Sequence, residues 1–222
     1  PIFNHTSTLT TPISPAWGLF NGDLQTVLPC VIFDSLDLHI PYIRRWVTNT
    51  HVYESNPIDI AFPRNEKGEL YHDKTKTILV AFHGLNGSSQ AAYLQRHVLQ
   101  YNKAGHTCIV LNSRGFGGGI ILGTTCFNGG ATDDLYFAVL ASHVLAGNCT
   151  QNDILQYSRQ NYNQGRSSKY SFKNCFITPP NDLTQQHLLQ TPISAVGLSM
   201  GAIMLTKYIV EYARFSGISS AV

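Results

Sequence analysis

The chain has 222 residues, of which 43% are hydrophobic and 13% are charged, and its formal net charge is +2. This length and hydrophobic content suffice for one full-sized core and favour a single domain. No block of like charge is present, which argues against nucleic acid as a partner, and no apolar run is long enough to span a bilayer. The five cysteines are widely spaced and odd in number, so we expect free thiols and no disulfide framework or metal site.

Residues 1–76 form an N-terminal segment that mixes aromatic and polar residues and contains frequent prolines. Short apolar stretches predict two strands here, at residues 43–48 and 58–62. The polar sequence PRNEKGE at residues 63–69 predicts the turn that follows the second strand.

Residues 77–147 contain two strand-loop-helix units. In the first, the continuous apolar run TILVAF predicts a strand buried on both faces of a parallel sheet, and a glycine-rich loop, HGLNGSS, follows it. Apolar residues at helical spacing then predict a helix over residues 90–105, with Gly105 ending it. The second unit begins at Thr107 with TCIVLN and continues through a glycine loop to a helix at residues 132–147. This alternation predicts an α/β fold with a mostly parallel central sheet flanked by helices.

The second of these helices carries its own boundary signals. Thr132 or Asp133 is expected to cap its first turn, and Gly147 is expected to end it. The regular pattern then stops, because residues 148–190 are rich in Asn, Gln, Ser and Tyr and have no clear period. We interpret them as a polar insertion, partly disordered, since α-to-β connections usually take only about 2–6 residues.

Residues 191–222 contain a third buried strand, a short turn and an amphipathic helix. The turn is Gly197-Leu198-Ser199-Met200-Gly201, a GxSxG sequence between a strand and a helix. Such a turn projects its serine into the cleft at the carboxyl ends of the strands, and small residues on either side let strand and helix pass closely. Ser199 is therefore the candidate nucleophile. The alternative is a serine that only caps the helix.

The loop at residues 83–87, HGLNG, is the second candidate element of a catalytic site. Acyl transfer passes through an oxyanion that preorganised backbone N–H groups stabilise. In this architecture one donor follows the nucleophile and the other comes from the loop after an earlier strand, which predicts the amides of Met200 and Leu85, with Gly84 giving the loop its room. His83 is rejected as the catalytic base, because in this fold the base usually comes late in the chain.

A third glycine loop, NSRGFGGG at residues 112–119, lacks the spacing of a dinucleotide-binding turn, because Ile120 stands where the last glycine would be needed. We expect Arg114 to fix this loop through hydrogen bonds, in preference to contacting substrate. No metal or cofactor is predicted.

The segments NGDLQTVLP, FHGLNGSSQAAYLQRHV, NSRGFGGG, TDDL and VGLSMGA, in this order, resemble the AB hydrolase 4 family of the α/β-hydrolase fold. That family contains bacterial carboxylesterases, yeast medium-chain ethyl-ester synthases, and animal monoacylglycerol lipases and phospholipases. The resemblance implies a serine esterase or lipase acting on acylglycerol or phospholipid esters through Ser199. It also implies membrane association, through a segment outside this chain. Gly22-Asp23-Leu24 replaces the family's Gly-His-Leu, and the insertion at residues 148–190 is atypical.

The resemblance places the triad acid and histidine after later strands, and therefore beyond Val222. Residues 1–222 are accordingly expected to be one incomplete α/β-hydrolase domain, its N-terminal part only. As an isolated fragment it is expected to be inactive and poorly folded, with an exposed sheet edge. Two other functions stay open: acyl transfer to an alcohol at the same site, and a catalytically dead scaffold that binds a lipid or a protein.

Overall fold

The computed structural model describes residues 21, 23, 28, 38–49, 54–123, 126–148, 191–213 and 216–222. The chain divides into two compact units, Pro1–Asp37 and Leu38–Val222, and all the strands and helices discussed here belong to the second. The polar insertion expected at residues 148–190 lies outside the described residues, apart from Asn148. The assignment of residues 1–222 to one domain stays a prediction.

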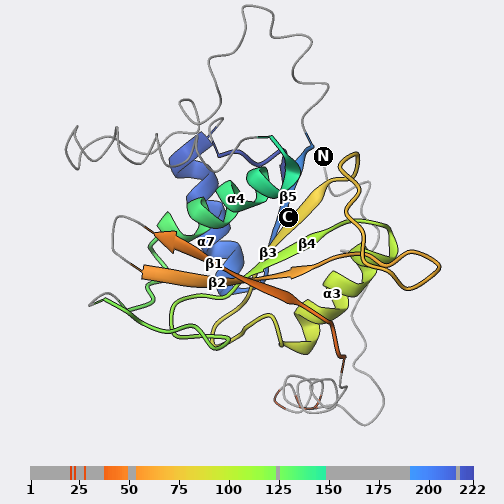
Figure 1. Ribbon diagram of the computed structural model, residues 1–222. Helices are drawn as coiled ribbons and strands as arrows, with labels where there is room; N and C mark the ends of the chain where they lie inside the picture. The colour runs from red at the N-terminus through yellow and green to blue at the C-terminus, as the bar shows by residue number, and fades with distance from the viewer. Residues whose placement is uncertain are drawn as a thin grey trace, which may run out of the picture. The chain divides into compact units, whose positions relative to one another are not determined.

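The second unit is built around a six-stranded sheet (Figure 1). In chain order its strands are β1 (Ile43–Asn49), β2 (Glu54–Ala61), β3 (Ile78–Phe82), β4 (Cys108–Leu111), β5 (Ile193–Gly197) and β6 (Ser220–Ala221). Their spatial order is β1-β2-β4-β3-β5-β6. The pairings β4–β3, β3–β5 and β5–β6 are parallel, whereas β2 runs antiparallel to both of its neighbours. Only β2 is reversed, so the prediction of a mostly parallel α/β sheet is confirmed.

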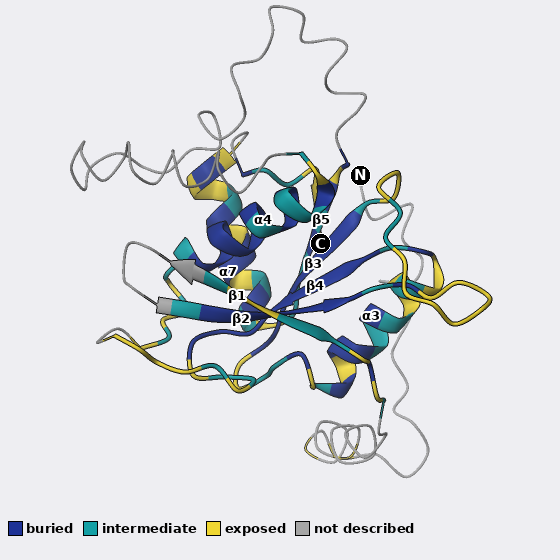
Figure 2. Cartoon of the chain, viewed as in Figure 1, coloured by how far each residue is buried: buried dark blue, intermediate teal, exposed yellow. Residues whose placement is uncertain are grey.

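Three helices cover the two faces of this sheet: α3 (Ala92–Lys103), α4 (Asp133–Ala146) and α7 (Met200–Tyr212). Side chains alternate between the faces along β3, as strand geometry requires. Ile78 and Val80 belong to the core cluster that contains the buried residues of α4 and α7, whereas Leu79 belongs to the cluster that contains those of α3. Figure 2 shows the result, a central sheet that is buried along most of its length. Each fully buried aliphatic side chain of this kind contributes about 1.5–3 kcal/mol.

The carboxyl ends of the three central strands lie at the same level of the sheet. Phe82, the last residue of β3, is in register with Leu111 at the end of β4 and with Gly197 at the end of β5. The loops that begin at His83, Asn112 and Leu198 therefore leave one common edge, where ligands bind in α/β sheets.

One strand boundary and one helix cap differ from the sequence-based expectations. The structure starts β2 at Glu54, before the expected residue 58, because its polar first residues pair with β1 from Glu54 onward. Thr132 does occupy the N-cap of α4, but its hydroxyl donates to the Glu211 carboxylate and does not cap the helix. Gly147 ends α4 in the left-handed conformation, with a φ of 76°, as expected.

Candidate active site

Ser199 occupies a strained turn between β5 and α7. Its φ of 56° and ψ of −117° lie in a region that residues with a side chain rarely adopt, and its side chain is exposed. Strain of this kind persists only where the surrounding structure enforces it, and it is concentrated at functional sites. The conformation is the one expected for a nucleophile that a strand-to-helix turn presents at the sheet edge.

The glycines on either side of Ser199 leave no room for a side chain. A Cβ atom on Gly197 would lie 2.5 Å from the Cα of Ala202, and one on Gly201 would lie 2.4 Å from the carbonyl oxygen of Phe82. Both distances fall well inside van der Waals contact with backbone atoms. The glycines are therefore required because strand β5, helix α7 and the end of β3 meet at this turn.

The turn is tied to the loop that follows β3. The Leu198 N–H donates to the Phe82 carbonyl over 3.1 Å, which continues the β3–β5 pairing one residue past the strand end. In the next loop, a Cβ on Gly84 would lie 3.3 Å from the Cβ of Ser199. The structure thus brings the candidate nucleophile and the candidate oxyanion loop into contact, although they are far apart in the sequence.

The Gly84 carbonyl fixes the direction of the candidate donor at Leu85. It accepts hydrogen bonds from His83 Nδ1, at 2.8 Å, and from the Gly87 N–H, at 3.0 Å. The N–H of a trans peptide points opposite to its C=O, so these bonds turn the Leu85 N–H away from the interior of the loop. Among the described residues, no acceptor bonds the Leu85 N–H. The Met200 N–H opens α7, where backbone donors have no partner within the helix.

His83 is committed to holding this loop. Its Nε2 accepts a hydrogen bond from the Ser113 N–H over 3.0 Å, so Nδ1 carries the proton that is donated to the Gly84 carbonyl. Burial lowers the pKa of His83, and the bond to Gly84 only partly opposes this effect. The ring is 3% exposed and neutral, with both nitrogens occupied. This geometry agrees with its exclusion as the catalytic base.

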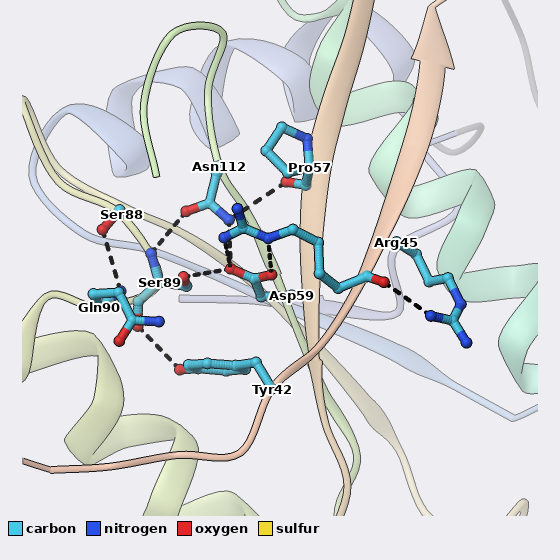
Figure 3. A network of polar contacts seen from close by, with 9 residues as sticks. Tyr42, Arg45, Pro57, Asp59, Ser88, Ser89, Gln90 and Asn112 are labelled. Carbon is cyan, nitrogen blue, oxygen red and sulfur yellow. Dashed lines mark hydrogen bonds and ion pairs between the residues drawn. The ribbon is translucent and has the colours of Figure 1, made fainter. Parts of the chain in front are cut away.

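A buried carboxylate that sequence reasoning missed anchors the far end of the same loop (Figure 3). Asp59 of β2 is 1% exposed and forms a two-point ion pair with its cross-strand neighbour Arg44, with both N–O distances 2.7 Å. The same carboxylate accepts hydrogen bonds from the Ser89 hydroxyl and from the Asn112 side-chain amide, at 2.5 Å and 2.9 Å. Asp59 therefore joins β1 to the loops that follow β3 and β4.

Further bonds complete this network. The Ser89 N–H donates to Asn112 Oδ1 over 2.8 Å, and the Tyr42 hydroxyl donates to the Ser89 carbonyl over 3.1 Å. Burial alone would raise the pKa of Asp59, but the bonds from Arg44, Ser89 and Asn112 outweigh it and hold the pKa below its ordinary value. The sequence did contain one signal, because Asp59 is an isolated acid inside the apolar run IDIAF.

The structure also explains the loop at residues 112–119. Arg114 forms a two-point ion pair with Asp134 of α4, at 2.8 Å and 2.9 Å, and its side chain is 5% exposed. The prediction that Arg114 fixes this loop through hydrogen bonds is confirmed. Phe116 from the loop packs against the ring of Phe127, and a Cβ on Gly129 would contact the Met200 side chain at 3.5 Å. The stretch around Gly129, which follows this loop, therefore lies next to Met200 of the serine turn.

Among the described residues, no side chain is hydrogen-bonded to Ser199 as a triad partner would be. Of the histidines in the described part of the chain, none forms a hydrogen bond with Ser199; the four with assigned partners bond to other groups. These four are His72, His83, His106 and His143. Within the same residues, no three His, Cys, Asp or Glu side chains lie together as a metal site requires.

Comparisons with known proteins give matches to solved structures only. No protein-family model and no curated protein matches the chain. Similar structures include the Pyrococcus furiosus esterase Pf2001, with 15% identity and a TM-score of 0.45, covering 83% of this chain and 51% of the esterase. Brefeldin A esterase, a bacterial homologue of human hormone-sensitive lipase, has 14% identity and a TM-score of 0.47, covering 95% of this chain and 50% of that enzyme. An α/β serine hydrolase homologue from Coxiella burnetii has 12% identity and a TM-score of 0.41, and the match covers 77% of this chain and 57% of the Coxiella chain. The chain thus spans about half the length of these structures, and the resemblance to the AB hydrolase 4 family stays a prediction.

Proposed function

We propose that this protein is a serine hydrolase of carboxylic esters, with Ser199 as its nucleophile. One observation carries the proposal: an exposed serine, in a backbone conformation that is costly for it, lies against a glycine loop whose Leu85 amide is free to donate. A serine that only capped α7 would need no such conformation. Its side chain in fact makes no capping hydrogen bond with the helix.

The proposed reaction proceeds through an acyl-enzyme. Ser199 Oγ attacks the ester carbonyl carbon and loses its proton to a base, and the Leu85 and Met200 amides stabilise the resulting oxyanion. The intermediate collapses by breaking the bond to the alcohol oxygen, which takes up the proton and leaves. Water then attacks the acyl group and releases the acid. We expect the base to be a histidine outside the described residues, as the family resemblance implies.

The proposed substrate class is a lipid ester, of the acylglycerol or phospholipid type. The family resemblance supports it, and so does the apolar character of the loops at the carboxyl edge. Leu85, Ile120 and Leu122 on these loops are 73%, 59% and 63% exposed. Membrane association is proposed from the resemblance alone. Within the part of the chain that the structure describes, no helix has the length and apolar character to cross a bilayer.

The test uses the full-length protein, a fluorophosphonate probe and p-nitrophenyl esters of increasing chain length. We expect the probe to label Ser199 and hydrolysis to favour longer acyl chains. Ser199→Ala is expected to lower kcat by at least about 1,000-fold. Ser219→Ala changes an exposed serine outside the turn and serves as the control. Undiminished hydrolysis by Ser199→Ala would refute the assignment, and lipid binding without labelling or hydrolysis would favour the scaffold function.

A further inference from the structure

Tyr93 lies in the first turn of α3, directly after the candidate oxyanion loop. Side chains on a helix point back toward its N-terminus, so the phenol of Tyr93 extends toward the loop and away from the core. The ring is 40% exposed. It therefore adds little to the buried interior, and its contacts with the loop need a separate explanation.

The phenol oxygen of Tyr93 fills the inside of the turn at residues 84–87. It accepts the Gly84 N–H at 2.9 Å. A Cβ on Gly87 would lie 2.5 Å from this oxygen, and one on Gly84 would lie 3.4 Å from it. Both glycines thus face the hydroxyl, and the Gly87 N–H closes the turn around it by donating to the Gly84 carbonyl.

The position of Gly84 connects this hydroxyl to the reacting centre. A Cβ on Gly84 would lie between the Tyr93 oxygen and Ser199, and its distance to the Ser199 Cβ would be 3.3 Å. One side of the Gly84 residue is therefore held by Tyr93, through the N–H, and the other by His83, through the carbonyl. The carbonyl of the peptide between Gly84 and Leu85 is held by His83 and Gly87, and Tyr93 fixes the peptide before it, so loss of the Tyr93 bond would loosen Gly84 on its N-terminal side.

We propose that Tyr93 is a positioning residue for the reaction at Ser199, which acts by holding Gly84 so that the Leu85 amide faces the developing oxyanion. This inference rests on the proposed function. The Tyr93 hydroxyl occupies the Gly84 N–H, so Gly84 cannot take the place of Leu85 as the oxyanion donor. The effect of Tyr93 is exerted in the transition state, because the oxyanion forms only there.

The experiment compares Tyr93→Phe with Tyr101→Phe in the full-length enzyme. Both tyrosines belong to α3 and are similarly exposed, at 40% and 38%, but only Tyr93 bonds to the loop. The measurements are kcat and KM for a p-nitrophenyl ester, the inhibition constant of an alkyl boronic acid, and the melting temperature. A boronate bound to a serine carries a tetrahedral, negatively charged centre, so its affinity reports oxyanion stabilisation directly.

Tyr93→Phe is expected to lower kcat about 10- to 100-fold, less than the loss of a whole oxyanion donor, with KM unchanged. Boronate affinity should fall by a similar factor while the melting temperature stays within about 2 °C, and Tyr101→Phe should match the native enzyme. If Tyr93→Phe kept native kcat and boronate affinity, or lost activity only in proportion to a lowered melting temperature, the proposal would be overturned. Absence of turnover and labelling in the native enzyme would overturn the proposed function itself, and the role of Tyr93 with it.

Discussion

Gly201 shows how a single hydrogen atom in place of a side chain can decide whether the serine turn forms. It is the second residue of α7, where alanine would ordinarily favour the helix by about 1 kcal/mol. A methyl group there would instead overlap the Phe82 carbonyl oxygen, a backbone atom at the end of the central strand β3. The overlap can be relieved only if α7 moves away from β3, and that movement would carry Ser199 with it.

We therefore predict that Gly201→Ala lowers the free energy of unfolding by about 1–3 kcal/mol, in spite of its better helix propensity. Chemical denaturation would measure the loss. Gly130→Ala is the matched control, because a Cβ there would meet only the ends of the Asn128 and Lys207 side chains, which can move. We expect the control to stay within about 0.5 kcal/mol of the native protein. Equal stability of the two variants would contradict the steric argument.

At the level of elements, β2 is the strand on which the polar network depends. Its Asp59 carboxylate is buried, whereas the side chain of its partner Arg44 is 36% exposed. If Asp59 were removed, the Arg44 guanidinium could still be solvated by water. If Arg44 were removed, the Asp59 carboxylate would stay buried without its partner. The ion pair is thus asymmetric, and the larger penalty is expected when the arginine is removed.

Arg44→Gln is predicted to cost about 2 kcal/mol of unfolding free energy, below the about 3–5 kcal/mol of a fully buried pair because of this partial exposure. Arg45→Gln is the neighbouring control, since the Arg45 side chain is exposed and donates only to the Arg44 carbonyl. Its effect should be no more than about 0.5 kcal/mol. A loss of similar size in both variants, measured by urea unfolding, would show that the Asp59 pair has no special role.

The same strands show what could be predicted from the sequence. The runs ILVAF, CIVL and ISAVG are apolar enough to identify β3, β4 and β5, and the GxSxG spacing located the turn at Ser199. The two-residue β6 carries no such pattern. The Asp59 network was not predictable, because it joins residues from four places in the chain and depends on β2 being reversed. Tyr93 was missed because a tyrosine in an amphipathic helix gives no sign of the loop that its hydroxyl bonds.

For the whole molecule, two buried histidines and one half-buried histidine predict how stability depends on pH. Burial lowers the pKa values of His72, His83 and His143; Lys74 adds to the effect at His72, and a carbonyl bond partly opposes it at His83 and His143. The unfolded chain, with histidine pKa values near about 6.5, then binds protons that the native state does not. The free energy of unfolding should therefore fall as the pH drops below about 6.5, by up to about 1.4 kcal/mol per pH unit for each histidine.

Unfolding measured between pH 7.5 and 5.5 checks this prediction, with His143→Gln as the informative variant. The glutamine amide can still donate to the Gly217 carbonyl, the bond that His143 Nε2 makes, but it does not titrate. In this variant the free energy of unfolding should change less steeply with pH, by the contribution of about one proton. A flat profile for the native protein would contradict the prediction.

The strand order also bears on when the serine turn forms during folding. β3 pairs with β4 after a single loop and helix, but Ile78 pairs with Ile193 of β5 only across about half of the chain. Closing so long a loop is entropically costly and slows the pairing it permits. Because the turn at Ser199 is held against Phe82, it cannot exist before that closure. We therefore expect folding intermediates that lack the β3–β5 pairing to be inert toward a serine-directed probe, so that the appearance of labelling would report when these two strands pair.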